Sequence, residues 1–169
     1  MPKFKDIPSF RKPNYRANVS WSYLKSHLER FKEDHNVDLQ PDFQRGHVWT
    51  DQQKIDYIEF CLMGGGSGKD IYFNCKGWMG SFDGPMVLVD GQQRINAVLD
   101  FLNNKVKAFG YFYDEYTDKL NSIDQDFIFY VNNLSDYKDV LRWYLALNTG
   151  GTIHTKEEID KVKKMLKEG

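Results

Sequence analysis

An apolar strand pattern that passes directly into a helical pattern is the strongest structural constraint in this sequence. The run Met86-Val87-Leu88-Val89 has the composition of a buried strand. Apolar residues then recur at helical spacing, at Ile95, Val98, Leu99 and Leu102. The chain must therefore turn abruptly at Asp90-Gly91, where a strand ends and a helix begins.

Four further helices are predicted from residues that commonly cap a helix at its start. The expected capping residues are Ser20, Thr50 with Gln53, Ser135, and Thr155 with Glu158. Strands are predicted from β-branched and aromatic runs at residues 71–73, 86–89, 106–113 and 127–131. Helices combined with short mixed strands indicate a compact domain of the α+β or α/β class.

The length of 169 residues and the hydrophobic content of 41% fit one globular domain. Residues 1–19 carry Pro2, Pro8 and Pro13 among scattered charges, so we expect an extended N-terminal arm before a domain over residues 20–169. No apolar run approaches the roughly 20 residues that span a bilayer, and the N-terminus lacks the apolar stretch of a secretory signal. A cytoplasmic location without membrane contact is therefore expected.

The charge balance and the scattered histidines and cysteines narrow the possible functions. The 23 basic and 24 acidic residues nearly cancel, so any contact with DNA must be local. Cys61 and Cys75 lack the spacing of a zinc site, and reduced thiols are expected. The four histidines have no metal-nuclease context, and they are expected to be packing or surface residues. They are His27, His35, His47 and His154.

The segment Asp90-Gly91-Gln92-Gln93-Arg94 is the first candidate for a ligand site. Backbone N–H groups at a helix start lack intrahelical partners and, with the helix dipole, favour an anion. Gly91 lets the backbone approach that anion, Arg94 can grip phosphate oxygens, and the two glutamines can bond a ligand or a water. Asp90 can cap the helix or hold Mg²⁺. The structural alternative is a tight turn in which Asp90 caps the helix and Arg94 forms a surface ion pair.

Two other segments permit a ligand function but favour a structural one. Residues 64–69 are similar to a phosphate-binding P-loop, but Met63 and Asp70 stand where the pattern needs Gly and Ser or Thr, so we expect a flexible loop. An aromatic run beside Lys105 and Lys107 could stack bases, although such runs are more often strands with alternate residues buried. Its members are Phe109, Tyr111, Phe112, Tyr113 and Tyr116.

Three segments, in order along the chain, resemble a known family. Residues 89–94 resemble the Asp-Gly-Gln-Gln-Arg signature of a ParB/sulfiredoxin-like domain family, which includes the N-terminal part of GmrSD-type modification-dependent restriction enzymes and related phage-defence proteins. Residues 43–49 are similar to its aromatic-Gln-Arg-x-x-x-Trp segment, and residues 147–151 to its Leu-Asn-x-Gly-Gly segment. Three ordered matches are far more specific than any one of them.

The resemblance implies an α+β, ParB-like single domain with a small mixed sheet flanked by helices, which binds and hydrolyses a nucleoside triphosphate with Mg²⁺ as the possible cofactor. The expected nucleotide- and phosphate-binding residues are Gln44, Arg45, Gly91, Gln92, Arg94, Asn148, Gly150 and Gly151. Catalytic roles are expected for Asp90, Gln93 and Arg94, with His47 and Trp49 as accessory residues. In this scheme Arg45 and Arg94 neutralise phosphate charge, while Gln93 or Asp90 orients the attacking water.

Two alternatives to a nucleoside triphosphatase stay open. One is a non-catalytic nucleotide- or DNA-binding module that acts as a sensor, an inhibitor or a nuclease partner, and the other is a phosphotransferase acting on DNA or another acceptor. Because the sequence ends at Gly169, no His-Asn-His nuclease part is expected, and nuclease activity is not expected of this chain alone. The expected partners are a nucleoside triphosphate, DNA including modified DNA, and a separate nuclease or regulatory protein, in a bacterial cell or a phage-infected host.

Overall fold

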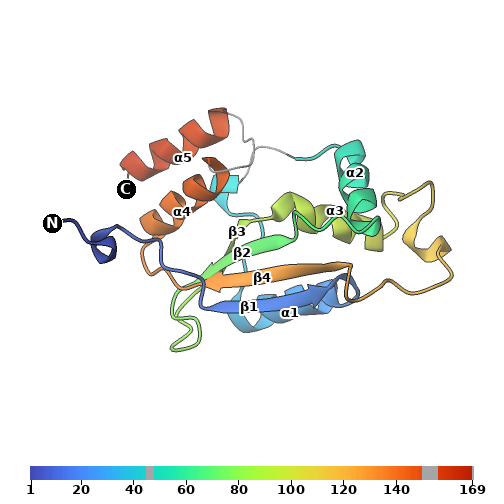
Figure 1. Cartoon of the computed structure of the whole chain (residues 1–169), viewed down its shortest axis with the longest axis horizontal. Coiled ribbons are helices and arrows are strands. Elements are labelled where there is room, and N and C mark those ends of the chain that lie inside the picture. Colours follow the sequence, from blue (N-terminus) through green and yellow to red (C-terminus); the bar gives the residue numbers. More distant parts are fainter. Residues whose placement is uncertain (45–47, 150–155, 169) are drawn as a thin grey trace.

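A mixed four-stranded sheet forms the centre of the fold. The computed structural model describes residues 1–44, 48–149 and 156–168. The strands are β1 (Tyr15–Ser20), β2 (Asp70–Cys75), β3 (Met86–Asp90) and β4 (Asp126–Asn132), in the order β1-β4-β2-β3 (Figure 1). β4 runs antiparallel to β1 and parallel to β2, and β2 runs antiparallel to β3. The predicted α+β class with a small mixed sheet is confirmed.

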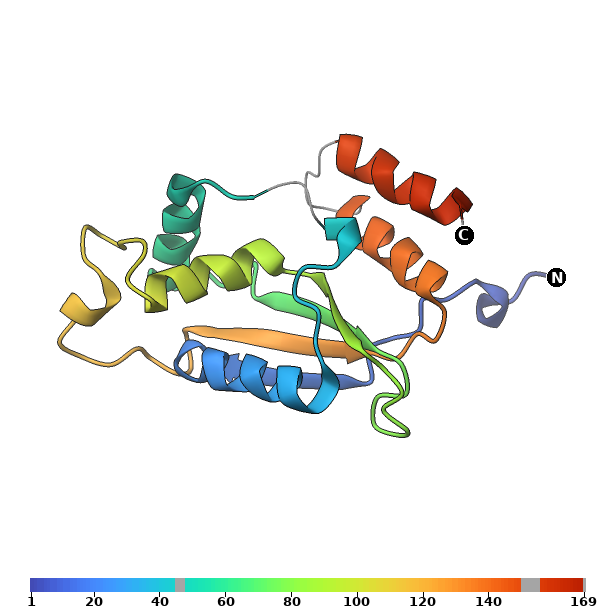
Figure 2. The same ribbon diagram turned by 180° about the vertical axis from the view of Figure 1, so that it is seen from behind.

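Helices pack on both faces of this sheet. Within the described residues the α-helices are α1 (Leu24–His35), α2 (Asp51–Leu62), α3 (Gln92–Leu102), α4 (Tyr137–Thr149) and α5 (Lys156–Glu168). Short 3-10 turns are η1 (Phe4–Asp6), η2 (Trp21–Tyr23), η3 (Asp42–Gln44) and η4 (Tyr113–Glu115). The pair α4 and α5 lies towards one end of the molecule and α2 towards the other, as the opposed views of Figures 1 and 2 show. None of the described helices is long and apolar enough to cross a membrane.

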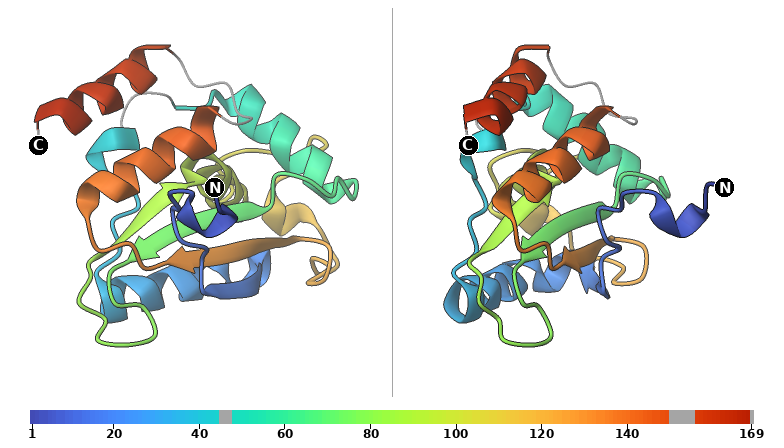
Figure 3. Two further views of the ribbon diagram at one scale, coloured as in Figure 1. Left: turned by 60° about the vertical axis from the view of Figure 1, so that its left-hand side comes forward. Right: turned by 90° about the vertical axis from the view of Figure 1, so that its left-hand side faces the viewer.

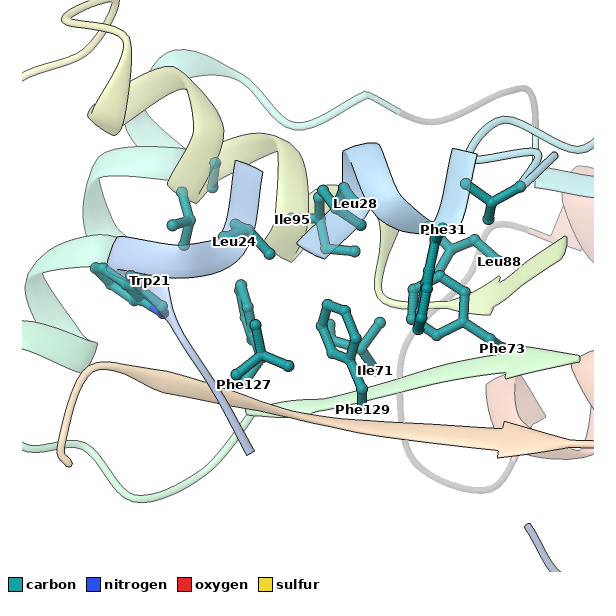
Figure 4. Close-up of a cluster of buried hydrophobic side chains, with 14 of the residues drawn as sticks. Trp21, Leu24, Leu28, Phe31, Ile71, Phe73, Leu88, Ile95, Phe127 and Phe129 are labelled. Atoms are coloured by element: carbon teal, nitrogen blue, oxygen red, sulfur yellow. The ribbon is translucent and has the colours of Figure 1, made fainter. Parts of the chain in front are cut away.

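The larger hydrophobic core lies between one face of the sheet and the helices α1, α2 and α3. The predicted helix is confirmed and its stripe of Leu24, Leu28 and Phe31 is buried, but Ser20 caps the preceding turn η2 and not α1 itself. Alternate strand residues meet this stripe because successive side chains of a strand point to opposite faces. Figure 4 shows Ile71, Phe73, Leu88, Phe127 and Phe129 of the strands together with Ile95 of α3.

A second, smaller core packs against the opposite face. Val89 and Tyr72 of the sheet contact Phe43 of η3 and the apolar sides of α4 and α5. The helices α4 and α5 lie side by side over the sheet in both views of Figure 3. Because this core includes both Phe43 and Val89, it holds η3 beside the end of β3.

Two predicted elements differ from the structure. The strand expected at residues 106–113 is wrong: Ala108 and Tyr111 form only an isolated bridge, and η4 follows. Phe109 and Gly110 have φ of 50° and 83°, so the chain reverses there instead of extending. The sheet also begins inside the segment expected to be an arm, because residues 15–20 pair with β4. Only residues 1–14 precede the sheet.

The capping predictions have mixed outcomes. The capping box of Thr50 and Gln53 at the start of α2 is confirmed. At the start of α4 the predicted cap Ser135 is wrong by one position, because the carboxylate of Asp136 accepts the Lys138 N–H at 2.9 Å. The box predicted for α5 includes Thr155, which lies outside the described residues.

Candidate functional site

A β-bulge at the end of β3 sets the direction of Asp90. Phe73 is opposite Leu88 while Tyr72 is opposite Asp90, so Val89 is an extra residue on β3. Such a bulge re-aims the side chains that follow it. Asp90 therefore lies opposite Tyr72, beside the smaller core.

Gln44 holds this bulge from outside the sheet. Its side-chain amide donates to the carbonyl oxygen of Leu88 and, at 2.7 Å, to that of Val89. Both N–H donors of the amide are thereby used, which leaves only an acceptor oxygen. An acceptor oxygen does not suit an anionic phosphate, so the contacts favour a positioning role for Gln44 over direct phosphate binding.

Replacing Gln44 with leucine is expected to lower the free energy of unfolding by about 1–3 kcal/mol, because two bulge carbonyls lose their hydrogen-bond partner. Urea denaturation measures this change. Gln52→Leu is the matched control, because the Gln52 amide bonds only the exposed Asp56 one helical turn away; its effect is expected to stay within about 0.5 kcal/mol. Equal effects of the two changes would contradict the positioning role.

Gly91 makes the change from strand to helix possible. Its φ is +112°, and a Cβ at this position would lie 2.4 Å from Cδ1 of Ile71 and 3.5 Å from Nη2 of Arg94. Neither the backbone conformation nor the space admits a side chain. Gly91 itself is the N-cap of α3 and no side-chain hydrogen bond caps the helix there, so of the two roles open to Asp90 the capping role is not the one it has. The first turn of α3 thus begins without a capping side chain.

Arg94 lies one turn into α3 and is largely buried. Its Nη2 donates to the backbone oxygen of Asp70 at 2.7 Å and to Oδ2 of Asp90 at 3.0 Å. The ion pair with Asp90 is thus present, but the Arg94 side chain is only 16% exposed, so the pair is not a surface one. Nε of Arg94 is buried and has no hydrogen-bond partner among the described residues. The guanidinium is anchored on one side and keeps an unused donor.

The two glutamines of the motif tie the chain before α2 to the start of α3. Nε2 of Gln92 donates to the carbonyl of Leu39 at 3.0 Å, and Oε1 of Gln93 accepts the backbone N–H of Trp49 at 2.9 Å. The Trp49 ring in turn packs edge-on against Tyr57 at 5.4 Å between ring centroids. Two of the three predicted segments, at residues 43–49 and 89–94, are therefore joined by direct hydrogen bonds. Ligand-binding roles for these side chains stay predictions.

Asn148 represents the third segment near the end of α4. It is 3% exposed, and its Nδ2 donates to the backbone oxygen of Tyr144 at 2.8 Å. Its Oδ1 is buried and has no partner within residues 1–44, 48–149 and 156–168. The other predicted residues of these segments lie outside the described residues. They are Arg45, His47, Gly150 and Gly151.

Comparison with known families shows a match over residues 26–140 to the family described as the GmrSD restriction endonuclease N-terminal domain. The match covers more than half of the chain. This chain belongs to that family. The resemblance inferred from three short segments is thereby confirmed, and two of those segments lie inside the matched range. No curated protein and no solved structure matches the chain.

The side chains of Tyr57, Tyr72 and Cys61 lie near Arg94 in this GmrSD family member, and they were not predicted from the sequence as part of the site. Burial raises the pKa of Tyr57, of Tyr72 and of the Cys61 thiol, and in each case the positive charge of Arg94 partly opposes the shift. The Tyr57 hydroxyl donates to the backbone oxygen of Gly68 at 2.7 Å. These groups therefore carry no charge near neutral pH. Their approach to Arg94 depends on strand register and helix packing, for which no sequence signal exists.

The described residues of this GmrSD family member do not provide enough side-chain ligands to hold a metal ion by themselves. They contain no group of three or more His, Cys, Asp or Glu side chains that could hold a metal ion. Asp90 offers one carboxylate, whose Oδ2 already pairs with Arg94. His27 and His35 pack against aromatic rings, as expected for packing histidines. A single carboxylate suits only a Mg²⁺ that is held mainly by phosphate oxygens and water.

Proposed function

We propose that this chain binds a nucleoside triphosphate at the junction of β3 and α3, and hydrolyses it, within bacterial restriction or phage defence. The observation that carries the proposal is Arg94, beside a helix start opened by a glycine: its buried Nε has no partner in the part of the chain that the structure describes. A buried donor without a partner is uncommon and calls for a ligand or a water. A phosphate oxygen at the first turn of α3 would meet both that guanidinium and the helix N–H groups.

The neighbouring residues suit a phosphate that binds and is then attacked by water. Gly91 lacks a Cβ, so the phosphate can approach the backbone closely. Asp70 anchors Arg94 through its backbone oxygen, which keeps the guanidinium in place for stabilising charge on the transferring phosphoryl group. A phosphate that engages Arg94 would compete with Asp90 for it and leave the carboxylate to orient a water. Mg²⁺ carried by the nucleotide would supply further charge neutralisation when bound.

Nucleotide binding without turnover is the second candidate, and the contacts of Gln93 favour it. Its Oε1 already accepts the backbone N–H of Trp49, so a water would have to share this oxygen, which has two lone pairs, with that bond. In that case the domain would act as a sensor or as a partner of a nuclease. In either case any contact with DNA would have to come from a local surface, because a formal net charge of −1 provides no overall attraction to DNA.

The experiment that tests the proposal exposes the full chain to each nucleoside triphosphate with Mg²⁺ and follows both phosphate release and thermal unfolding. At 100 times Kd, binding adds about 2.7 kcal/mol of stability, which raises the Tm of a protein of this size by about 5–11 °C. Stabilisation with phosphate release supports hydrolysis, and stabilisation alone supports the binding module. If no triphosphate stabilises the chain, the phosphate site is wrong.

A further inference from the structure

A cavity of about 360 Å³ lies at the opposite end of α3 from the phosphate site. Its apolar walls include Leu62 at the end of α2, Phe101 near the end of α3, and the aromatic rings of Tyr113 and Tyr116. Most of its lining residues belong to the segment between α3 and β4, part of which is the yellow loop in Figure 1. The eleven residues of α3 separate the two places by about 16 Å. A cavity of this volume falls within the range of small-molecule sites.

Gln125 brings an unpaired polar group to this cavity. It is 7% exposed and is one of the lining residues. Its backbone is fixed, since its N–H donates to Asn121 O at 2.9 Å and its carbonyl accepts the Trp21 N–H at 3.0 Å. Its side-chain amide makes no hydrogen bond to the described residues. The amide atoms are not among the fully buried unpaired groups of the described residues, so the amide donor and acceptor are open to solvent.

Phe109 lines the cavity with an aromatic ring, and its backbone conformation is strained. It occupies a turn in which Ala108 and Tyr111 exchange backbone hydrogen bonds, and its φ is +50°. Asn, Asp or Gly normally fill such a position, because bulky residues disfavour the left-handed region. Its N–H is held by a carboxylate oxygen of Glu59 at 2.7 Å, and the residue is 49% exposed. Strain that holds an exposed ring beside a cavity is typical of ligand contacts.

The charges around the cavity decide which kind of ligand fits. Asp118 and Asp124 line it against the single lysine Lys119 among its described lining residues, so a phosphate group would be repelled. Aromatic walls suit a flat ring, and a carboxamide pairs with an edge that carries a donor beside an acceptor, as nucleobases do. An uncharged ring system with such an edge meets all three requirements.

We propose that this cavity binds the heteroaromatic base of an uncharged nucleoside. Phe109 and Tyr116 contact the ring, and Gln125 pairs with its hydrogen-bonding edge. The site is separate from the phosphate site at Arg94 and does not depend on the function proposed for that site. The acidic wall favours a free nucleoside over a base within a nucleic-acid strand, because the strand brings phosphates.

The test titrates the full chain with adenosine, cytidine, guanosine and uridine by calorimetry, with a single-stranded oligonucleotide of mixed sequence as a separate arm. At least one nucleoside is expected to bind. Gln125→Leu is expected to weaken binding about tenfold because the amide that pairs with the base is removed, and melting without ligand shows whether the variant is folded. Phe109→Asn is expected to weaken it about tenfold by removing the stacking ring, with a turn that asparagine tolerates better.

Three results would overturn the proposal: no nucleoside binds at millimolar concentration, both variants bind as the parent chain does, or the oligonucleotide binds where free nucleosides do not. Arg94→Ala separates the two sites, since it is expected to leave nucleoside binding unchanged. Stabilisation by a triphosphate that is lost in Arg94→Ala, without any nucleoside binding, would leave the phosphate site standing and remove this one.

Discussion

Gly91→Ala is expected to lower the free energy of unfolding by about 3 kcal/mol, which corresponds to a fall in Tm of roughly 6–12 °C for a chain of this length. Two effects add. The backbone at φ +112° is unfavourable for any L side chain, and the new methyl group would lie 2.4 Å from Cδ1 of Ile71 in the main core. Either Ile71 or the start of α3 must move, and Arg94 moves with α3.

The matched control for this change is Gly64→Ala. Gly64 also has a left-handed backbone, at φ +86°, but a Cβ there would meet nothing within 4 Å. The control therefore carries the conformational strain alone, which is expected to be about 1–2 kcal/mol. Thermal and urea unfolding of both variants measure the difference. Equal losses of unfolding free energy in the two variants would show that the Ile71 side chain can move away from the new methyl group at no cost. The close packing of Ile71 against Gly91 would then not restrict residue 91.

Arg94→Ala is expected to weaken nucleoside triphosphate binding about 10- to 100-fold, because hydrogen bonds to charged groups contribute about 1.5–3 kcal/mol. Arg94→Lys is expected to fall between the parent and the alanine variant, since one ammonium group cannot reproduce the fork that reaches Asp70, Asp90 and a phosphate together. Titration calorimetry gives the dissociation constants, and melting without ligand shows whether each variant is folded.

Arg142→Ala is the matched control for Arg94. Arg142 of α4 also pairs with an aspartate close to it in the sequence, Asp139 at 2.8 Å, but its side chain is 52% exposed. Its loss is expected to leave both stability and nucleotide affinity nearly unchanged. A folded Arg94→Ala variant with the affinity of the parent chain would remove the assignment of the phosphate site.

The family can be predicted correctly from the sequence only when its short matching segments are considered together. The segment at residues 89–94 by itself fits an ordinary tight turn, and the ion pair between Asp90 and Arg94 is indeed present. The segment at residues 43–49 raises the specificity, because both segments belong to one ordered pattern. The structure supplies the physical connection: Gln93 bonds Trp49, and Gln44 bonds the bulge of β3.

The features that could be predicted from the sequence alone are those that depend on neighbouring residues in the chain. The capping box at Thr50, the stripe of α1 and the strand-to-helix turn at Gly91 each depend on residues within a few positions of one another. The strand prediction at residues 106–113 was wrong because it rested on aromatic composition, which favours an extended chain. Phe109 instead adopts a turn conformation that its residue type disfavours. Composition is a weaker guide than a cap or a glycine at a defined position.

Tertiary structure alone decided how the candidate site is assembled. The bulge at Val89, the anchoring of Arg94 on the backbone of Asp70, and the clamp by Gln44 join residues 15 to 45 positions apart. Backbone carbonyls are the partners in several of these bonds, and every residue type carries one. The sequence therefore determined where the turn lies and which side chains line it. The packing of β2, β3 and η3 decided which of them are already engaged, and it left Nε of Arg94 without a partner in the described residues.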